Sequence, residues 1–291
     1  MSEEVKTTFL IGELNDLDLV NYHLDGFVVP IKSFASYATR FFDLDEARII
    51  ASYCLNNNII RIAKVDKIIE NDELDSLHHT LDELLKMEYD YFMCTDMAVL
   101  AYFKNKNMLN KIIYSSSKMI ASLNEASYYV NQGIIPVPSS EISYDELKDI
   151  CKLDNICLTV YGYLDIFYSK RKLLSLFNDY QGKKAPFTFK NSYKIKEESR
   201  NEFNEILENE NGSFIFSDFI YMIYRELNEL KPKFLKINSY NIPKANLFKI
   251  IDIYQEAIEK GPTIANYNSL LDIDGKVGSG FLYVKANILD E

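Results

Sequence analysis

The chain has 291 residues, of which 47% are hydrophobic and 26% charged, and its formal net charge is −11. This composition is typical of a soluble globular protein, and the length suits one large α/β barrel or two ordinary domains. The acidic balance argues against binding of nucleic acid by the surface as a whole. The acidic first residues and the lack of a long apolar run predict neither a signal peptide nor a membrane span, so we expect a cytoplasmic protein.

The four cysteines, Cys54, Cys94, Cys151 and Cys157, form no C-x-x-C pair. Cys94 and Cys157 fall in strand-like runs, where a thiol packs as a small hydrophobic group. We therefore expect buried, reduced thiols, and neither a metal site nor an iron–sulfur cluster.

Short β-rich runs alternate with helical patterns along most of the chain, which indicates βαβ units and a parallel sheet. The eight predicted strands cover residues 8–12, 26–30, 59–63, 89–94, 111–114, 134–137, 156–161 and 234–238. The predicted helices cover residues 17–24, 43–55, 71–87, 97–105 and 122–132, a segment that begins at 143, and residues 244–260. Eight such units predict a (β/α)8 barrel. The alternative is an open, doubly wound sheet, which the absence of a G-x-G-x-x-G or Walker motif disfavours.

A long excursion separates the seventh and eighth predicted strands and exceeds the length of an ordinary loop. We interpret it as an inserted subdomain, which divides the chain into residues 1–167, 168–230 and 231–291. Residues 278–285 predict a last strand that packs on this insert or on the barrel.

In a barrel the reactive groups lie at the carboxyl ends of the strands, which gives a short set of candidates. They are Lys64 and Asp66, Thr95 and Asp96, Ser115, Ser116 and Ser117, Ser139, Ser140 and Glu141, Tyr161 and Asp165, and Lys236 and Asn238. From this set Asp66, Asp96, Glu141 and Lys236 are the predicted catalytic residues, and the three consecutive serines are predicted to bind substrate. A lysine beside carboxylates predicts a pocket for a small carboxylate ligand.

Several of these residues have plain structural alternatives. Asp96 precedes a helix and fits an N-cap, Glu141 fits a solvated carboxylate, and the serines fit a turn. No histidine follows a predicted strand, which argues against a Ser-His-Asp hydrolase.

The excursion is basic in an otherwise acidic chain. Residues 168–200 hold nine Lys or Arg against three Asp or Glu, and six aromatic residues are interleaved with them. Lys170, Arg171 and Lys172 are consecutive, and cations beside aromatic rings hold phosphates and stack on bases. We therefore predict that these three residues bind RNA, with a charged hairpin whose lysines cover aromatic faces as the alternative.

Several motifs resemble, in the same order, those of the collagenase-like peptidase family, also called peptidase family U32. They are Val160-Tyr-Gly-Tyr-Leu164 followed by Tyr168-Ser-Lys-Arg-Lys-Leu-Leu-Ser175, Thr95-Asp-Met-Ala-Val-Leu100, Ser139-Ser-Glu-Ile-Ser143, Asn211-Gly-Ser-Phe-Ile-Phe-Ser217, Leu235-Lys-Ile-Asn238 and Gly280-Phe-Leu-Tyr-Val-Lys285. The chain is most similar to short bacterial members without a cluster.

The resemblance implies a barrel-like catalytic domain and a role in oxygen-independent hydroxylation of the wobble uridine of tRNA, with prephenate as co-substrate and a paralogous subunit as partner. Many members carry a four-cysteine iron–sulfur cluster. Here Asp165 and Lys172 occupy two positions where such members have cysteine, and Tyr161-Gly162 replaces their His-Gly. We therefore expect no cluster.

The leading hypothesis is tRNA hydroxylation, with Lys236 and Arg171 holding a carboxylate donor. The alternatives are a non-catalytic barrel that stabilises a partner subunit, and a peptidase, as the family name implies.

Overall fold

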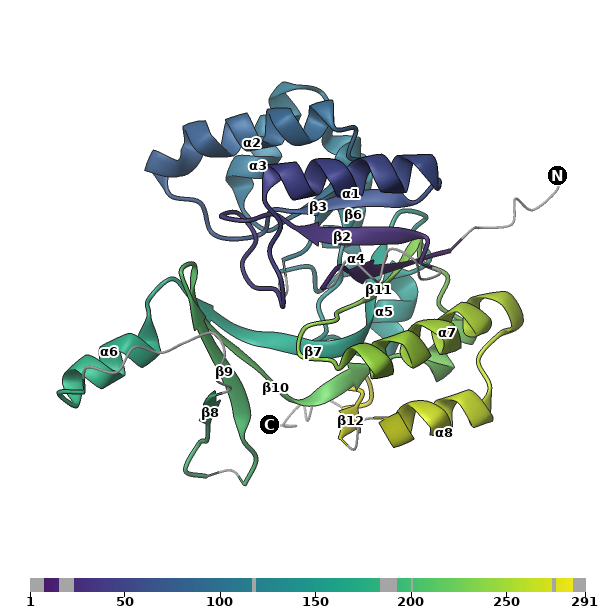
Figure 1. Ribbon diagram of the computed structural model, residues 1–291. Coiled ribbons are helices and arrows are strands. Elements are labelled where there is room, and N and C mark those ends of the chain that lie inside the picture. Colours follow the sequence, from purple (N-terminus) through teal and green to yellow (C-terminus); the bar gives the residue numbers. More distant parts are fainter. Residues whose placement is uncertain are drawn as a thin grey trace, which may run out of the picture.

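The computed structural model describes residues 8–15, 24–116, 119–183, 193–199, 201–273 and 276–284. Eight parallel strands form the larger part of one curled sheet (Figure 1). They are β1 (Phe9–Glu13), β2 (Gly26–Pro30), β3 (Ile60–Lys64), β4 (Tyr91–Cys94), β5 (Ile112–Tyr114), β6 (Ile135–Pro136), β7 (Cys157–Ser169) and β11 (Phe234–Ile237). Each of the eight predicted strands is therefore present, although several boundaries differ by one or two residues.

The strand order is that of a (β/α)8 barrel which is open at one place. The parallel strands follow the order β6-β5-β4-β3-β2-β1-β11-β7, so the first and the last predicted strands pair, as barrel closure requires. Within the described residues no pairing joins β6 to β7. The molecule is thus a mixed α/β protein built on a curled half-barrel, and the sheet continues past β7 where a closed barrel would turn back to β6.

Three antiparallel strands extend the sheet beyond β7: β10 (Gly212–Met222), β9 (Asn204–Asn209) and β8 (Tyr193–Ile195). Here the structure differs from the sequence analysis, because β7 runs eight residues beyond the predicted strand end at 161, and the boundary predicted at 168 lies inside it. Long antiparallel partners explain the extension, since β10 pairs with β7 from Tyr161 to Ser169. The division into domains at residues 168 and 230 stays a prediction.

The helices, except for the projecting α6, pack against the outer face of the curled sheet, with α1, α2 and α3 on one side and α7 and α8 at the far end (Figure 1). They are α1 (Leu44–Asn56), α2 (Leu74–Lys86), α3 (Met97–Asn105), α4 (Leu123–Val130), α5 (Tyr144–Ile150), α6 (Leu173–Tyr180), α7 (Lys244–Lys260) and α8 (Ile264–Ile273), with 3-10 turns at Asn71–Glu73, Leu109–Lys111 and Arg225–Asn228. Capping boxes at Asp43 and Ser143 begin α1 and α5, as their sequences predict. The helix predicted over 17–24 lies almost wholly outside the described residues, which resume at Leu24.

The end of the chain forms less strand than its sequence predicts. A two-residue strand, β12 (Val277–Gly278), pairs with β10, and turns follow over residues 280–283. The predicted strand over 278–285 therefore packs on the sheet only at its start, and its last residue lies outside the described part of the chain.

One side chain from each parallel strand fills the concave side of the half-barrel. The buried cluster consists of Ile11, Val28, Ile62, Met93, Ile113, Ile135, Cys157 and Phe234, together with Val137. Side chains alternate between the two faces of a strand, so the residue two positions further along points to the same interior. Six of the eight next positions are polar and form a layer above the apolar one at the carboxyl ends of the strands: Glu13, Lys64, Thr95, Ser115, Thr159 and Lys236. The other two are Pro30 and Val137.

Candidate active site

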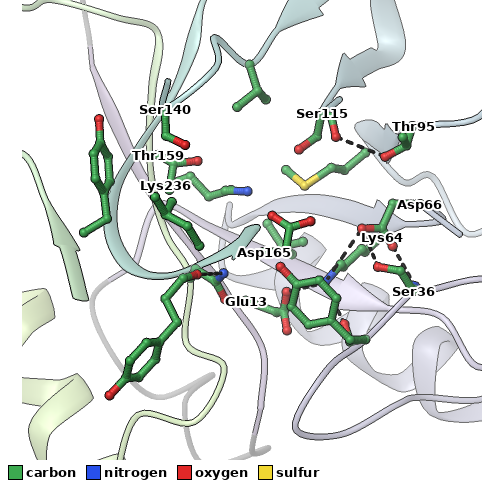
Figure 2. A pocket seen from close by; sticks show the side chains of 18 of the residues that line it. Glu13, Ser36, Lys64, Asp66, Thr95, Ser115, Ser140, Thr159, Asp165 and Lys236 are labelled. Atoms are coloured by element: carbon green, nitrogen blue, oxygen red, sulfur yellow. Dashed lines mark hydrogen bonds and ion pairs between the residues drawn. The ribbon is translucent and has the colours of Figure 1, made fainter. Parts of the chain in front are cut away.

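A cavity of about 110 Å³ lies over this polar layer. Its walls include charged side chains from four strands: Glu13 of β1, Lys64 of β3, Asp165 of β7 and Lys236 of β11 (Figure 2). The position matches the carboxyl-end location of active sites in barrel enzymes. A small, partly enclosed space lined by opposite charges suits a small polar ligand or the reacting end of a larger one.

The floor of the cavity holds a buried ion pair. Lys64 Nζ donates to Glu13 Oε2 at 2.8 Å and to the carbonyl oxygen of Tyr37 at 2.7 Å, and it lies 3.9 Å from Asp66 Oδ2. Lys64 and Glu13 are only 4% and 7% exposed. Burial alone would lower the pKa of Lys64, but the carboxylates of Asp66 and Glu13 outweigh it and raise that pKa. Lys64 is therefore a fixed cation and not a base.

Asp66 is positioned by a loop between β2 and α1. Its two carboxylate oxygens accept hydrogen bonds from the backbone N–H of Ser36 at 2.8 Å and from Ser36 Oγ at 2.9 Å. The same loop is held from the other side by buried amides, because Asn209 Nδ2 donates to the carbonyl of Ser36 and Asn211 Nδ2 to that of Ala35. The turn between β9 and β10 thus fixes the loop that orients Asp66.

Lys236 lies in the cavity near Asp165, whose pKa it lowers, but not in direct ion-pair contact with it. No carboxylate of a described residue lies within ion-pair distance of its amine, although Lys64 beside it has two. Figure 2 shows Lys236 and Asp165 directed into the cavity from β11 and β7. Lys236 is half-buried, and an ammonium group with donors that no described carboxylate uses can bind an anionic group.

Asp165 is a carboxyl group of this cavity whose pKa is raised. Burial raises its pKa to about 6; Lys236 and Lys64 lower this pKa in part, and Asp66 raises it further. A carboxyl group with a pKa near the working pH can exchange a proton with a bound ligand. Asp165 is one of the strand-end candidates but not one of the four predicted catalytic residues.

Aromatic side chains form one wall of the cavity. Tyr37 contacts Phe214, Phe216 and Tyr240 with ring centroids 5.0–5.4 Å apart, and Tyr168 stacks on Phe214 at 4.5 Å. Lys64 Nζ lies 4.2 Å from the centre of the Tyr37 ring. This wall joins the antiparallel strands to the half-barrel and lowers the polarity around the charged groups.

The close approach of β7 to the residue that follows its parallel neighbour β11 depends on a glycine. Gly162 has φ +123°, and a Cβ atom there would lie 2.3 Å from the carbonyl oxygen of Asn238. The Asn238 side chain in turn donates to the carbonyl oxygen of Tyr163 at 2.9 Å. A side chain at residue 162 would push apart the two strands that carry Asp165 and Lys236.

The four predicted catalytic residues separate into two groups. Asp66 and Lys236 line the cavity. Asp96 does not line it. Its Oδ1 accepts a hydrogen bond from the backbone N–H of Ala98 and so caps α3, and its Oδ2 accepts one from the backbone N–H of Ile69. Glu141 is exposed and lines a smaller adjoining cavity of about 70 Å³, together with Ser140 and Asp165. The geometry thus favours the capping alternative for Asp96 and leaves Asp66 and Lys236 as the stronger candidates.

The predicted substrate-binding residues are similarly divided. Ser115 lines the cavity, where its carbonyl oxygen accepts a hydrogen bond from Thr95 Oγ1. Ser116 is buried, and Ser117 lies outside the described residues. Lys170 pairs with Glu70 at 2.5 Å, whereas Arg171 and Lys172 are exposed beyond the end of β7. The basic run therefore lies outside the cavity.

Glu13 and Tyr37 are among the cavity residues that sequence reasoning missed. Glu13 is the last residue of β1 and so carries the same strand-end signal as Lys64, although the predicted strand stops one residue before it. Tyr37 lies in a loop, and only the packing of β10 against that loop brings it to the site. No local pattern in the sequence identifies it.

The donor set does not fit a four-cysteine cluster. Cys54, Cys94, Cys151 and Cys157 are buried and free, and none of them lines the cavity. Within the described ranges no three His, Cys, Asp or Glu side chains are grouped as a metal ion requires.

The chain thus combines a curled α/β half-barrel with a polar cavity at the carboxyl ends of its strands. The chain belongs to peptidase family U32, whose model matches residues 17–271. It is 25% identical over 241 residues to "tRNA hydroxylation protein P2" of Bacillus subtilis (strain 168), which covers 75% of this chain and 78% of that protein. Among solved structures, the U32 peptidase Mk0906 superposes with a TM-score of 0.52 at 13% identity, over 84% of this chain and 97% of that one. The similarity to this solved structure concerns the fold alone.

Within the described residues no helix has the length and apolar character of a membrane span.

Proposed function

We propose that this protein acts in the hydroxylation of the wobble uridine of tRNA, with a small carboxylate such as prephenate as co-substrate. The observation that carries the proposal is Lys236, which has no carboxylate of a described residue at ion-pair distance and is directed into the cavity of a U32 family protein. The similarity to a tRNA hydroxylation protein over three quarters of the chain gives the class of reaction.

In this proposal the residues of the cavity have separate roles. Lys236 binds the carboxylate of the co-substrate through charge-assisted hydrogen bonds. Asp165 gives or takes a proton, since its pKa of about 6 lets both forms exist near neutral pH. Asp66 is held in place by Ser36 and adds a fixed negative charge beside Lys64 on the floor of the cavity.

A peptidase remains the weaker candidate. The cavity contains serine and threonine hydroxyl groups, but none of its described serines donates to or accepts from Lys64 or Lys236, and no histidine lines it. A hydrolytic serine requires a base within hydrogen-bond reach. The geometry therefore supports binding and proton transfer better than nucleophilic attack.

A non-catalytic role as a stabilising partner subunit is the third candidate, and the association with a paralogous subunit stays a prediction. A scaffold has no need of an ammonium group without an ion-pair partner in a cavity, because leaving a charge there costs stability. The charges of the cavity thus favour a working site.

The test is nucleoside mass spectrometry of tRNA from a strain that lacks this gene and any paralogue. The strain is complemented with the wild type, with Lys236→Ala, or with Lys260→Ala, a surface control on α7. We expect hydroxyuridine derivatives to return with the wild type and the control, but not with Lys236→Ala. Unchanged hydroxyuridine in the deletion strain would contradict the proposal.

A further inference from the structure

Helix α6 (Leu173–Tyr180) projects from the body of the molecule and has no buried residue (Figure 1). Its apolar side chains face solvent: Leu176 and Phe177 are 54% exposed, and Tyr180 is 89% exposed. Leaving several large apolar groups in water on one short helix forgoes the burial that normally stabilises such a helix. Exposed aromatic residues grouped in this way mark a binding surface.

The helix is nevertheless held firmly at its start. The backbone N–H groups of Leu174 and Ser175, which have no partner within the helix, donate to Glu208 Oε2 at 2.7 and 3.1 Å. The backbone N–H of Leu173 donates to Ser213 Oγ at 2.9 Å. A carboxylate at this end also complements the helix dipole. Side chains of β9 and β10 therefore hold the start of α6 and set the direction in which its aromatic side chains project.

Positive charge surrounds this face. Arg171 and Lys172 precede the helix, Lys183 follows it, and all three are exposed. Within the described residues none of these three has a carboxylate at ion-pair distance, while their neighbour Lys170 is paired with Glu70. The helix itself carries one acidic residue, Asp179. In a chain with a net charge of −11, this combination of cations and aromatic rings is complementary to a polyanion that has flat apolar groups.

The same strand connects α6 to the cavity. β7 brings Asp165 to the cavity and Tyr168 to its aromatic wall, and then ends at Ser169, just before Arg171 and Lys172. β7 therefore links the cavity to the start of α6 along the chain.

We propose that α6 and its flanking cations bind a single-stranded loop of RNA. Bases stack on Phe177 and Tyr180, and phosphates contact Arg171, Lys172 and Lys183. The inference rests on the proposed function for its choice of loop, which is the anticodon loop. A protein partner is less well matched, because the apolar patch is small and the three cations around it have no described carboxylate at ion-pair distance.

The test uses the full-length protein and a fluorescent anticodon stem-loop RNA with uridine at the wobble position. We expect Phe177→Ala/Tyr180→Ala to weaken binding at least about tenfold, because stacking contributes a factor of that order for each base. The matched control is Tyr128→Ala, which removes a tyrosine that is 63% exposed on α4. Circular dichroism confirms that each variant is folded.

The cations are tested through salt dependence. Arg171→Ala/Lys172→Ala is expected to reduce the slope of log Kd against log salt by about 1.4, or roughly 0.7 for each phosphate contact to a single strand. An unchanged slope together with unchanged affinity would overturn the assignment of the phosphate contacts.

Other outcomes separate this inference from the proposed function. Wild-type affinity in the aromatic double variant would overturn the inference, even if Lys236→Ala abolishes hydroxyuridine. The inference also fails if the double variant loses binding to anionic lipid vesicles, or to a co-purified protein, but keeps binding to RNA. RNA binding that depends on Phe177 and Tyr180 in a protein whose deletion leaves hydroxyuridine unchanged would support the inference and contradict the proposed function.

Discussion

Lys64 and Glu13 form a salt bridge of 2.8 Å between the ends of two strands, β3 and β1, that β2 separates. Both side chains are more than nine-tenths buried, and Glu13 Oε1 has no hydrogen-bond partner in the described part of the chain. A buried pair with one unsatisfied oxygen is a poor way to gain stability, because the loss of hydration offsets the attraction. Its position under the cavity explains it better, since it supplies fixed charges to the site.

Replacing one partner of this ion pair should lower the free energy of unfolding much more than replacing both. Lys64→Met leaves Glu13 charged and buried, so we expect the free energy of unfolding to fall by about 3–5 kcal/mol. The double variant Glu13→Gln/Lys64→Met should recover a large part of that loss. Urea denaturation measures both effects. The control is Arg40→Met, which removes an exposed pair with Glu46 and should change stability by less than about 1 kcal/mol.

The pKa of Asp165 makes stability depend on pH in a defined direction. The folded protein holds this proton up to about pH 6, whereas the unfolded chain releases it near its ordinary pKa of 3.8. The folded state therefore binds more protons between these values, and the stabilisation from this group is present at low pH and lost as pH rises through about 6. Asp165→Asn should remove this dependence and stabilise the protein at pH 8 by about 1–3 kcal/mol.

The comparison for Asp165→Asn is the difference between variant and wild type at pH 4, 6 and 8, measured by thermal unfolding. Taking the difference cancels the opposite contributions of carboxylates such as Glu73, whose pKa is lowered by Lys67 despite burial. A difference that does not change with pH would show that Asp165 titrates normally.

Gly162 lies so close to the backbone of Asn238 that adding a single methyl group there should destabilise the protein. Gly162→Ala places a Cβ within 2.3 Å of a carbonyl oxygen, so the strands that carry Asp165 and Lys236 must separate. We expect a loss of more than about 3 kcal/mol, in which a conformational penalty of roughly 1–2 kcal/mol is included. Gly182→Ala is the matched control, because Gly182 also has a positive φ, of 69°, but nothing lies within 4 Å of its added Cβ. Equal losses in the two variants would show that the close contact has no effect.

Lys236 and the lysine at the cavity floor should behave differently in activity and in stability. Lys236 has no ion-pair partner among the described residues, so Lys236→Met should leave the free energy of unfolding almost unchanged or raise it. Activity should nevertheless fall about a hundredfold or more, as when a positioned charge is removed from an active site. Lys236→Arg keeps the charge and should recover part of the activity. A variant that loses stability and activity together would indicate a structural role.

The sequence predicts the parallel part of the fold well because its information is local. Buried runs such as Gly26–Pro30 and helices such as Lys244–Lys260 have periodic patterns and clear ends, and both are found as predicted. The eight strands occur in the order that a barrel requires. The open edge between β6 and β7 was not predictable, since β6 has only two residues and the pairing of β7 with β10 is a long-range choice.

The candidate site was predictable where strand ends determine it. Asp66 and Lys236 were found in this way, and Asp165 was a candidate for the same reason. Asp96 follows a strand too, but its side chain is oriented by the hydrogen bond with which it caps α3. Tyr37 comes from a loop, and its place depends on contacts with β10 more than 170 residues away. Such contacts leave no pattern in the local sequence.

The most direct test of the account is a calorimetric titration of the purified protein with prephenate at pH 6 and pH 8. The account predicts binding by the wild type that is tighter at pH 6, because protonated Asp165 no longer repels the carboxylate that Lys236 holds. It predicts affinity at least about tenfold weaker in Lys236→Met, the usual scale for losing a charged hydrogen bond, and an unchanged affinity in Lys260→Met. Equal affinity in Lys236→Met and the wild type would contradict the account, as would the absence of binding at both pH values.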